Sequence, residues 1–334
     1  MNKKIVLIIL IFSISCTKDQ EEVFDNPKNT SAKVIGYFPA WRFGLSDDIE
    51  YCKLTHLNLA FANPDSEGNL IMPDISKIVN DAKSDNPNIQ ICISIGGGVL
   101  NSEQALNWSN LIDNSENRPK IVNKILEYVL SNNLDGVDVD LEWQYVTSGY
   151  SDFIIELNNA LDQHSKIITA ALPAKTLYSN LNNNALNIFD FINIMAYDFT
   201  GPWNPTSPGQ HSSYNHAIES IDFWKNSIGI TSEKLILGVP FYGYDFVNSD
   251  TVNAFTFSSM VELSNANADI DNVGTKFYNG RSTIRSKVQL ASNEVNGIMI
   301  WELGQDSFSE YSLLKTIHKE YDKLEIKTTE LCKD

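Results

Sequence analysis

The chain has 334 residues, of which 43% are hydrophobic and 20% are charged, and its formal net charge is -17. This composition is ordinary for a globular protein, and the length suits either one α/β barrel or two smaller domains. The strong negative charge argues against nucleic acid as a partner and against electrostatic binding to anionic membranes.

The N-terminus has the pattern of an export signal. The basic start, MNKK, precedes an apolar run, Ile5–Ile14, that is too short to span a membrane as a stable helix. The run ends in Ser13-Ile14-Ser15-Cys16, which resembles the lipobox of bacterial lipoproteins. The resemblance implies that residues 1–15 are a signal peptide and that Cys16 is lipidated. An ordinary secretory signal with a chance cysteine is the alternative.

A lipoprotein signal predicts a place in the cell envelope. We expect the protein to be anchored to a bacterial membrane, the outer membrane, solely through a lipid on Cys16. The acidic residues Asp19, Glu21 and Glu22 resemble the surface-export signals of some lipoproteins, so the cell surface is a second expectation. Residues 16–31 are polar and aperiodic, which predicts a flexible tether.

Three further cysteines show no disulfide framework and no metal-ligand spacing, so we expect no metal and no cofactor. Cys92 lies in an apolar run and is expected to be a small buried hydrophobe. A bridge between Cys52 and Cys332 stays open.

Eight β-prone runs follow the tether, and helix-compatible stretches separate most of them. Since parallel neighbours need crossover connections, this layout predicts a parallel sheet, and several runs are apolar throughout, as in strands covered on both faces. We predict a (β/α)8 barrel over 32–323 with a polar tail at 324–334; a doubly wound open sheet is the alternative. The runs are 33–38, 54–61, 89–95, 134–141, 166–172, 189–196, 234–240 and 296–301.

The stretch between the last two runs is longer than one helix requires. Residues 245–280 within it are expected to form either a small extra element or a long loop. We expect no second domain.

The fourth run, LDGVDVDLEW, alternates Asp138, Asp140 and Glu142 with apolar residues. On a strand, the three carboxyls project to one face. Three interpretations compete: a half-exposed antiparallel strand, a cation site, or a catalytic group in a barrel. Crowded carboxyls inside a barrel raise one another's pKa, and a barrel places its reactive groups where strands end, which is where Glu142 falls.

The motif Asp135-Gly136-x-Asp138-x-Asp140-x-Glu142 matches the DGxDxDxE signature of glycoside hydrolase family 18, which the chain therefore resembles. Companion motifs occur in the family's order over about 33–320. They are GYF at 36–38, LTHLNLAF at 54–61, SIGG at 94–97, MAYD at 195–198, GVPFYG at 238–243 and IWE at 300–302.

The resemblance implies a retaining, substrate-assisted glycosidase. Glu142 would protonate the glycosidic oxygen, and the substrate's 2-acetamido oxygen would attack C1. Asp140 would hold the acetamido N–H, and Asp138 would lie beneath it and share a proton with it. Tyr197 would donate its hydroxyl to the acetamido oxygen.

The resemblance also implies substrate-binding residues. Asp198 would contact the sugar at the cleavage point, Trp301 would form the floor of that sugar site, and Tyr37 and Ser94 would hydrogen-bond the buried charge. Trp203 is a further candidate sugar platform.

Among the other aromatic residues and histidines, Trp41 is a weaker candidate platform. Trp108, Trp143 and Trp224 are interpreted as packing, His56 as a core residue, and His211 and His216 as residues of a polar loop at the rim.

The chain departs from common chitinase patterns around the acid. Where the usual motif reads WEYP, this chain keeps the acid as Glu142 but has Leu141, Trp143 and Gln144 at the other three positions. Gly98 stands where Trp is frequent, and Tyr244 stands where Arg is common. The stretch before the last strand is too short for a full chitinase insertion domain, so we expect a shallower groove.

The expected function is hydrolysis of β-1,4 bonds in N-acetylglucosamine-containing glycans, either chitin or chitooligosaccharides, by a monomer. An endo-β-N-acetylglucosaminidase acting on the N-glycan chitobiose core and a non-catalytic glycan-binding lipoprotein are the alternatives.

Overall fold

The computed structural model describes residues 29–329. The predicted signal peptide, the predicted lipidation site Cys16 and the candidate bridge residue Cys332 lie outside the described residues. Within residues 29–329, no helix is long and apolar enough to cross a membrane.

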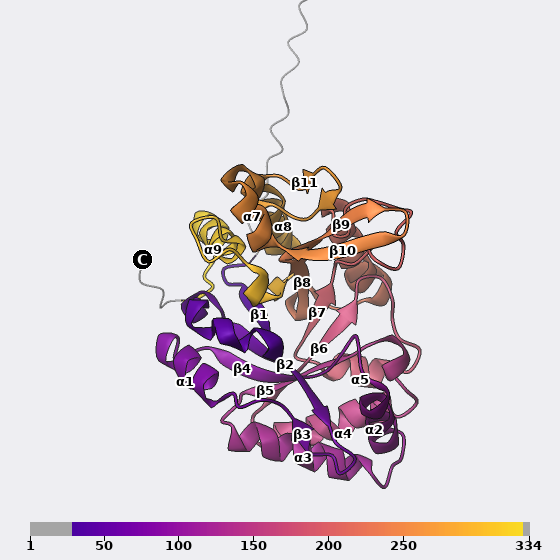
Figure 1. The fold of residues 1–334 in the computed structure, drawn as a ribbon. Coiled ribbons are helices and arrows are strands. Elements are labelled where there is room, and N and C mark those ends of the chain that lie inside the picture. The colour runs from indigo at the N-terminus through magenta and orange to yellow at the C-terminus, as the bar shows by residue number, and fades with distance from the viewer. Residues whose placement is uncertain (1–28, 330–334) are drawn as a thin grey trace, which may run out of the picture.

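A closed barrel of eight parallel strands forms the centre of the fold, which confirms the predicted (β/α)8 architecture (Figure 1). Pairing of the first two strands closes the barrel, so the open-sheet alternative is wrong. In barrel order the strands are β1 (Lys33–Pro39), β13 (Gly297–Trp301), β8 (Leu235–Pro240), β7 (Phe191–Met195), β6 (Ile167–Pro173), β5 (Gly136–Leu141), β4 (Gln90–Gly97) and β2 (His56–Pro64).

Helices cover the outside of the barrel and bury an apolar stripe against it. In α3, Pro119 lies in the first turn, where its missing N–H leaves no helical hydrogen bond unmade, and Ile121, Ile125 and Val129 are buried. The covering helices, α3 included, are α1 (Ser76–Asp85), α2 (Ser102–Ile112), α3 (Arg118–Ser131), α4 (Tyr150–Asp162), α5 (Asn183–Ile188), α6 (Tyr214–Asp222), α8 (Arg281–Glu294) and α9 (Leu313–Lys323).

A small α+β insertion lies between β8 and β13, where the sequence left an extra element or a loop open. It has a four-stranded antiparallel sheet, ordered β10-β9-β12-β11, and one helix (Figure 1, orange). Its elements are β9 (Tyr242–Asn248), β10 (Thr251–Thr256), α7 (Phe257–Leu263), β11 (Asn272–Val273) and β12 (Lys276–Phe277). A further short strand, β3 (Leu70–Ile71), pairs with the end of β2.

The segment after α9 stays on the barrel. Ile326 is buried in the main core, and Lys327 bridges in parallel to Ser31. The Thr329 hydroxyl donates to the Cys52 carbonyl oxygen at 2.6 Å. Cys52 itself is disulfide-bonded, while Cys92 is a fully buried free thiol, as predicted.

Candidate active site

The carboxyls of β5 point into the barrel. Asp138 and Asp140 are buried inside, while Val137, Val139 and Leu141 are buried on the opposite face against the helices. Because both faces of β5 are covered, the half-exposed antiparallel strand is excluded. Within residues 29–329, no group of three or more His, Cys, Asp or Glu side chains is arranged to hold a metal ion.

The Asp138 carboxyl accepts hydrogen bonds from side chains of four other barrel strands. Tyr37 from β1 and Ser94 from β4 each donate to Oδ2 at 2.7 Å, in the place the family resemblance implied. Thr169 from β6 donates to Oδ1 at 2.7 Å, and Asn193 from β7 at 3.2 Å. Burial raises the pKa of Asp138, and the four donors oppose that rise.

Thr169 and Asn193 were missed by the sequence reasoning. The signal that could have found them is register: Thr169 pairs with Asp138 across β5 and β6, and Asn193 lies two residues beyond Phe191, the partner of Thr169. Residues at these positions face the barrel interior at nearly the same level.

Asp140 is the member of the pair whose pKa is raised more strongly. Burial, followed by the charges of Glu142 and Asp138, raises the pKa of Asp140 well above its usual value. All four donors around Asp138 use it as an acceptor, so the surroundings favour the ionised form at Asp138 and the neutral form at Asp140. The Asp140 Oδ1 atom is buried without a hydrogen-bond partner, and the residue lines the cavity described below. It is therefore ready to meet a polar group of a ligand.

Glu142 follows β5 at the carboxyl end of the barrel, as predicted. Burial raises its pKa to about 7, and the charge of Asp198 adds to the rise. Its carboxyl occupies the space above Gly98, where an added Cβ would lie 2.5 Å from Oε1. A carboxylic acid with this pKa can act as a proton donor near neutral pH.

Tyr197 and Asp198 follow β7 and lie beside this acid. Burial raises the pKa of Tyr197 well above its usual value, so its hydroxyl stays a donor, and its partner is the weakly accepting Met299 sulfur at 3.9 Å. Asp198 has a φ of 62°, a left-handed conformation that Asp tolerates better than bulky residues. Its Oδ1 accepts from Tyr242 at 2.5 Å and Tyr244 at 3.0 Å.

His211 does not lie at the rim as predicted; it is fully buried beneath Asp198. Its Nδ1 is 3.3 Å from Asp198 Oδ1, and its Nε2 is 3.2 Å from the Tyr242 carbonyl oxygen. The polar surroundings in the sequence misled the prediction, because Tyr242, which packs on His211, comes from the distant strand β9. His216 stacks on Phe199 at a centroid distance of 3.8 Å.

A cavity of about 750 Å³ opens over these groups. Trp301 lies on its floor and stacks on Phe61 with ring centroids 5.6 Å apart. Trp41, Trp143 and Trp203 also line the cavity and are 63%, 54% and 59% exposed. Flat apolar rings exposed in a cavity suit the C–H faces of sugar rings.

Trp143 is therefore not a packing residue, and that interpretation was wrong. It has a φ of 48°, which turns its ring out of the core toward the cavity. Trp108 and Trp224 do pack, and each indole N–H is satisfied, by Asn63 at 2.7 Å and by the Pro173 carbonyl at 2.9 Å. His56 is a core residue, as predicted.

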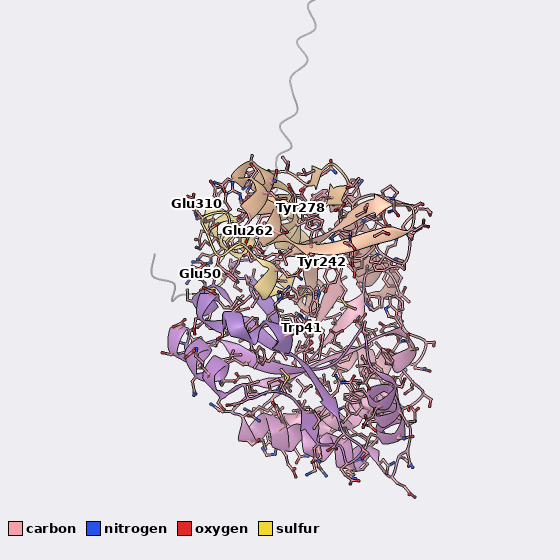
Figure 2. The ribbon with its side chains drawn as sticks, in the orientation of Figure 1. Trp41, Glu50, Tyr242, Glu262, Tyr278 and Glu310 are labelled. Atoms are coloured by element: carbon pink, nitrogen blue, oxygen red, sulfur yellow. The ribbon has the colours of Figure 1, made fainter. Side chains whose placement is uncertain are left out.

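The insertion between β8 and β13 contacts the site from outside the cavity. Figure 2 shows Tyr242 and Trp41 between the N-terminal half of the barrel and the insertion. Within the described chain, no residue of 242–277 lines the cavity, although Tyr242 and Tyr244 reach Asp198. The insertion therefore contributes to the site through Tyr242 and Tyr244.

A barrel with a buried aspartate pair, a glutamate of raised pKa at the strand end and an indole in the cavity has the groups that a glycoside hydrolase needs. The family model described as Glycosyl hydrolases family 18 matches residues 33–306. The chain therefore belongs to glycoside hydrolase family 18.

Two curated relatives illustrate the similarity. Chitinase-3-like protein 2 of Homo sapiens is 24% identical over 348 residues, which cover 83% of this chain and 87% of the relative. Class V chitinase of Arabidopsis thaliana is 26% identical over 268 residues, which cover 72% of this chain and 66% of the relative.

Solved structures are also similar. The GH18 chitinase ChiB from the chitin utilization locus of Flavobacterium johnsoniae is 53% identical, with 91% of this chain and 98% of that chain covered and a TM-score of 0.89. A chitinase from Bacteroides thetaiotaomicron is 27% identical, with 87% and 96% covered and a TM-score of 0.73.

Proposed function

We propose that this chain hydrolyses β-1,4 bonds between N-acetylglucosamine residues of chitin or chitooligosaccharides, with retention and with assistance from the substrate. One observation carries the proposal: the buried, unpartnered Asp140 Oδ1 faces a cavity that also holds a protonated Glu142 and the Trp301 floor. The similarity to a chitinase from a chitin utilization locus supports the choice of substrate.

The side chains divide the reaction between them. Glu142 gives its proton to the glycosidic oxygen as the bond to C1 breaks, and the acetamido oxygen forms the new bond to C1. Asp140 Oδ1 accepts the acetamido N–H, and the Tyr197 hydroxyl orients the acetamido oxygen. The Glu142 carboxylate then takes a proton from the water that attacks C1, and the bond from C1 to the acetamido oxygen breaks. This step restores the acid and the acetamido group, and the two displacements at C1 together retain the anomeric configuration.

The test compares the wild-type protein with Glu142→Gln on chitooligosaccharides, on chitin and on a high-mannose glycopeptide. We expect the wild type to shorten the chitooligosaccharides and the variant to lose activity by at least about 10³-fold. Product anomers read by proton NMR immediately after cleavage should be β. Cleavage of the glycopeptide alone would favour the chitobiose-core alternative, and binding without any cleavage would favour the non-catalytic one.

We further propose that the protein is an exported lipoprotein, lipidated on Cys16 and held by the tether 16–31. The disulfide-bonded Cys52 supports export, because disulfides persist mainly in oxidising compartments. Incorporation of labelled palmitate by the wild type and its loss in Cys16→Ser would support the anchor. Protease shaving of intact cells tests surface exposure, and light scattering of the soluble form tests the proposed monomer.

A further inference from the structure

Two tyrosine hydroxyls donate to Asp198 beside the acid, at a position where an arginine is common in the family. We infer that Tyr244, acting with Tyr242, positions the Asp198 carboxylate without cancelling its charge, and that this charge keeps Glu142 protonated toward neutral pH. The inference rests on the proposed function, because it concerns the proton that Glu142 delivers.

The contacts around Asp198 meet at one oxygen. Tyr242, Tyr244 and His211 all lie within 3.3 Å of Oδ1, which leaves Oδ2 for the cavity. His211 Nε2 faces the Tyr242 carbonyl oxygen, which can only accept, so Nε2 carries a hydrogen. His211 Nδ1 lies 3.4 Å from the backbone N of Asp198 as well as 3.3 Å from Oδ1, so the imidazole ring packs against both the backbone and the carboxylate of Asp198.

The strand that carries the two tyrosines is fixed. Tyr242 and Tyr244 alternate along β9 and so point to the same face. Between them, Gly243 lies so close to β12 that an added Cβ would be 2.3 Å from the Phe277 carbonyl oxygen. The two phenol rings meet edge to face at 5.6 Å, and His211 packs on both at 4.8 and 4.9 Å. The donors are therefore held in place before a substrate arrives.

The hydroxyls stay uncharged. Burial raises the pKa of Tyr242 and of Tyr244 above the usual value, so both are protonated donors near neutral pH. An arginine at position 244 would also donate to Asp198, but it would bring a positive charge and offset the carboxylate. With tyrosine there, the negative charge of Asp198 still acts on Glu142, where it adds to burial in raising the pKa to about 7.

Neither of the two lysines near the site takes over the role of an arginine. Among the residues that line the cavity, Lys175 carries the positive charge, and its amine pairs with Glu219 on α6 at 2.8 Å. Lys287 on α8 donates to Ser212 and Asn279 behind His211. The remaining titratable groups around Glu142 and Asp198 are Asp138 and Asp140 from β5, Tyr178 after β6, Tyr197 after β7, and His211, Tyr242 and Tyr244.

The decisive variant is Tyr244→Arg. Its added charge should stabilise the Glu142 carboxylate, so the alkaline limb of kcat/KM on a chitooligosaccharide should move to lower pH by about one unit. Tyr244→Phe removes one donor without adding charge and should move the limb in the same direction by less. In an Asp198→Asn background, Tyr244→Phe should cause no further shift, because there is no charge left to position.

Two controls match these changes. Val247→Arg adds the same charge to the same strand at a half-exposed residue outside the cavity. Tyr278→Phe removes a buried phenol that donates to the Asn267 carbonyl, higher in the insertion than Tyr242 (Figure 2). Both should leave the alkaline limb where the wild type has it.

Carbon-13 NMR titration measures the pKa of the Glu142 carboxyl without any turnover of substrate. Failure of this inference can therefore be distinguished from failure of the proposed function. An active wild type whose limb and Glu142 titration are unmoved by Tyr244→Arg would overturn the inference alone. If that variant does not fold, an unmoved limb in Tyr244→Phe has the same meaning. An inactive wild type in which Tyr244→Arg still lowers the Glu142 titration would overturn the proposed function and support the inference.

Discussion

Gly98 has no side chain and so leaves room for the carboxyl group of Glu142. Many family members carry Trp after the SIGG motif, but here the Glu142 carboxyl occupies the space in which a Cβ would stand, 2.5 Å from Oε1. The departure from the family pattern at position 98 is thus matched to the position of the proton donor. It does not indicate a degraded site.

Replacing Gly98 by Ala should displace the Glu142 carboxyl. We expect kcat/KM on chitooligosaccharides to fall by about 10²-fold, since small displacements of a catalytic group have effects of that size. The melting temperature should change little, because the residue lies in a loop at the barrel end. Gly44→Ala, at an exposed glycine outside the cavity where an added Cβ would meet nothing within 4 Å, is the control; equal losses in both variants would contradict this explanation.

Trp143 shows where the sequence could not be read locally. A tryptophan beside a buried strand ordinarily packs, and its left-handed backbone could not be foreseen from composition. By contrast, the carboxyl line of β5 could be predicted, because the motif fixes both the residue types and their spacing.

Trp143→Ala should raise KM for oligomers about tenfold and leave kcat nearly unchanged, as expected when binding is lost equally in the ground and transition states. Steady-state kinetics on a series of chitooligosaccharides gives the measurement. Leu106→Ala, an exposed apolar residue of α2 outside the cavity, serves as control. A fall in kcat alone would assign Trp143 a different role.

At the scale of elements, the eight strands could be predicted because parallel strands covered on both faces are apolar runs separated by helices. The insertion could not, because β10 is partly exposed and lacks the apolar run of a barrel strand, while β11 and β12 have only two residues each. The same limit applied to Asp306. This fully buried carboxyl precedes α9 and accepts from the Leu313 and Leu314 N–H groups at 2.8 and 3.0 Å and from the Ser312 hydroxyl at 2.7 Å.

Asp306→Ala should lower the free energy of unfolding by about 2–4 kcal/mol, because it leaves buried donors at the start of α9 without acceptors. Urea denaturation followed by circular dichroism measures the change. Glu310→Ala, an exposed residue of the same loop (Figure 2), should change stability by less than about 0.5 kcal/mol. Similar effects in both variants would show that Asp306 has no special role in capping the helix.

At the scale of the whole molecule, the acidic centre makes stability depend on pH. Burial and Asp198 raise the pKa of Glu142 from 4.5 to about 7 on folding. A raised pKa contributes stability that is fully present below pH 4.5 and is lost as the pH rises through 7. The groups that make the site reactive therefore destabilise the protein at alkaline pH.

Glu142→Gln should consequently raise the melting temperature at pH 8 by roughly 2–5 °C and have little effect at pH 4. Differential scanning calorimetry at the two pH values tests this. Glu262→Gln, at an exposed residue of α7 (Figure 2), is the matched control. A gain of equal size at both pH values would mean that packing, not protonation, is responsible.

The described chain begins next to the amino-terminal ends of the barrel strands. The Ala32 N–H donates to the Lys327 carbonyl at 2.9 Å, and Lys33 starts β1 beside Gly297, the first residue of β13. Glu142 and Trp301 lie at the opposite, carboxyl ends. If residues 16–31 lead to a membrane anchor as proposed, the tether joins the barrel at the end opposite the cleft. The anchor therefore leaves the cleft open to the side away from the membrane. The anchored enzyme would then cleave a solid polymer lying against the cell and release the fragments close to that cell.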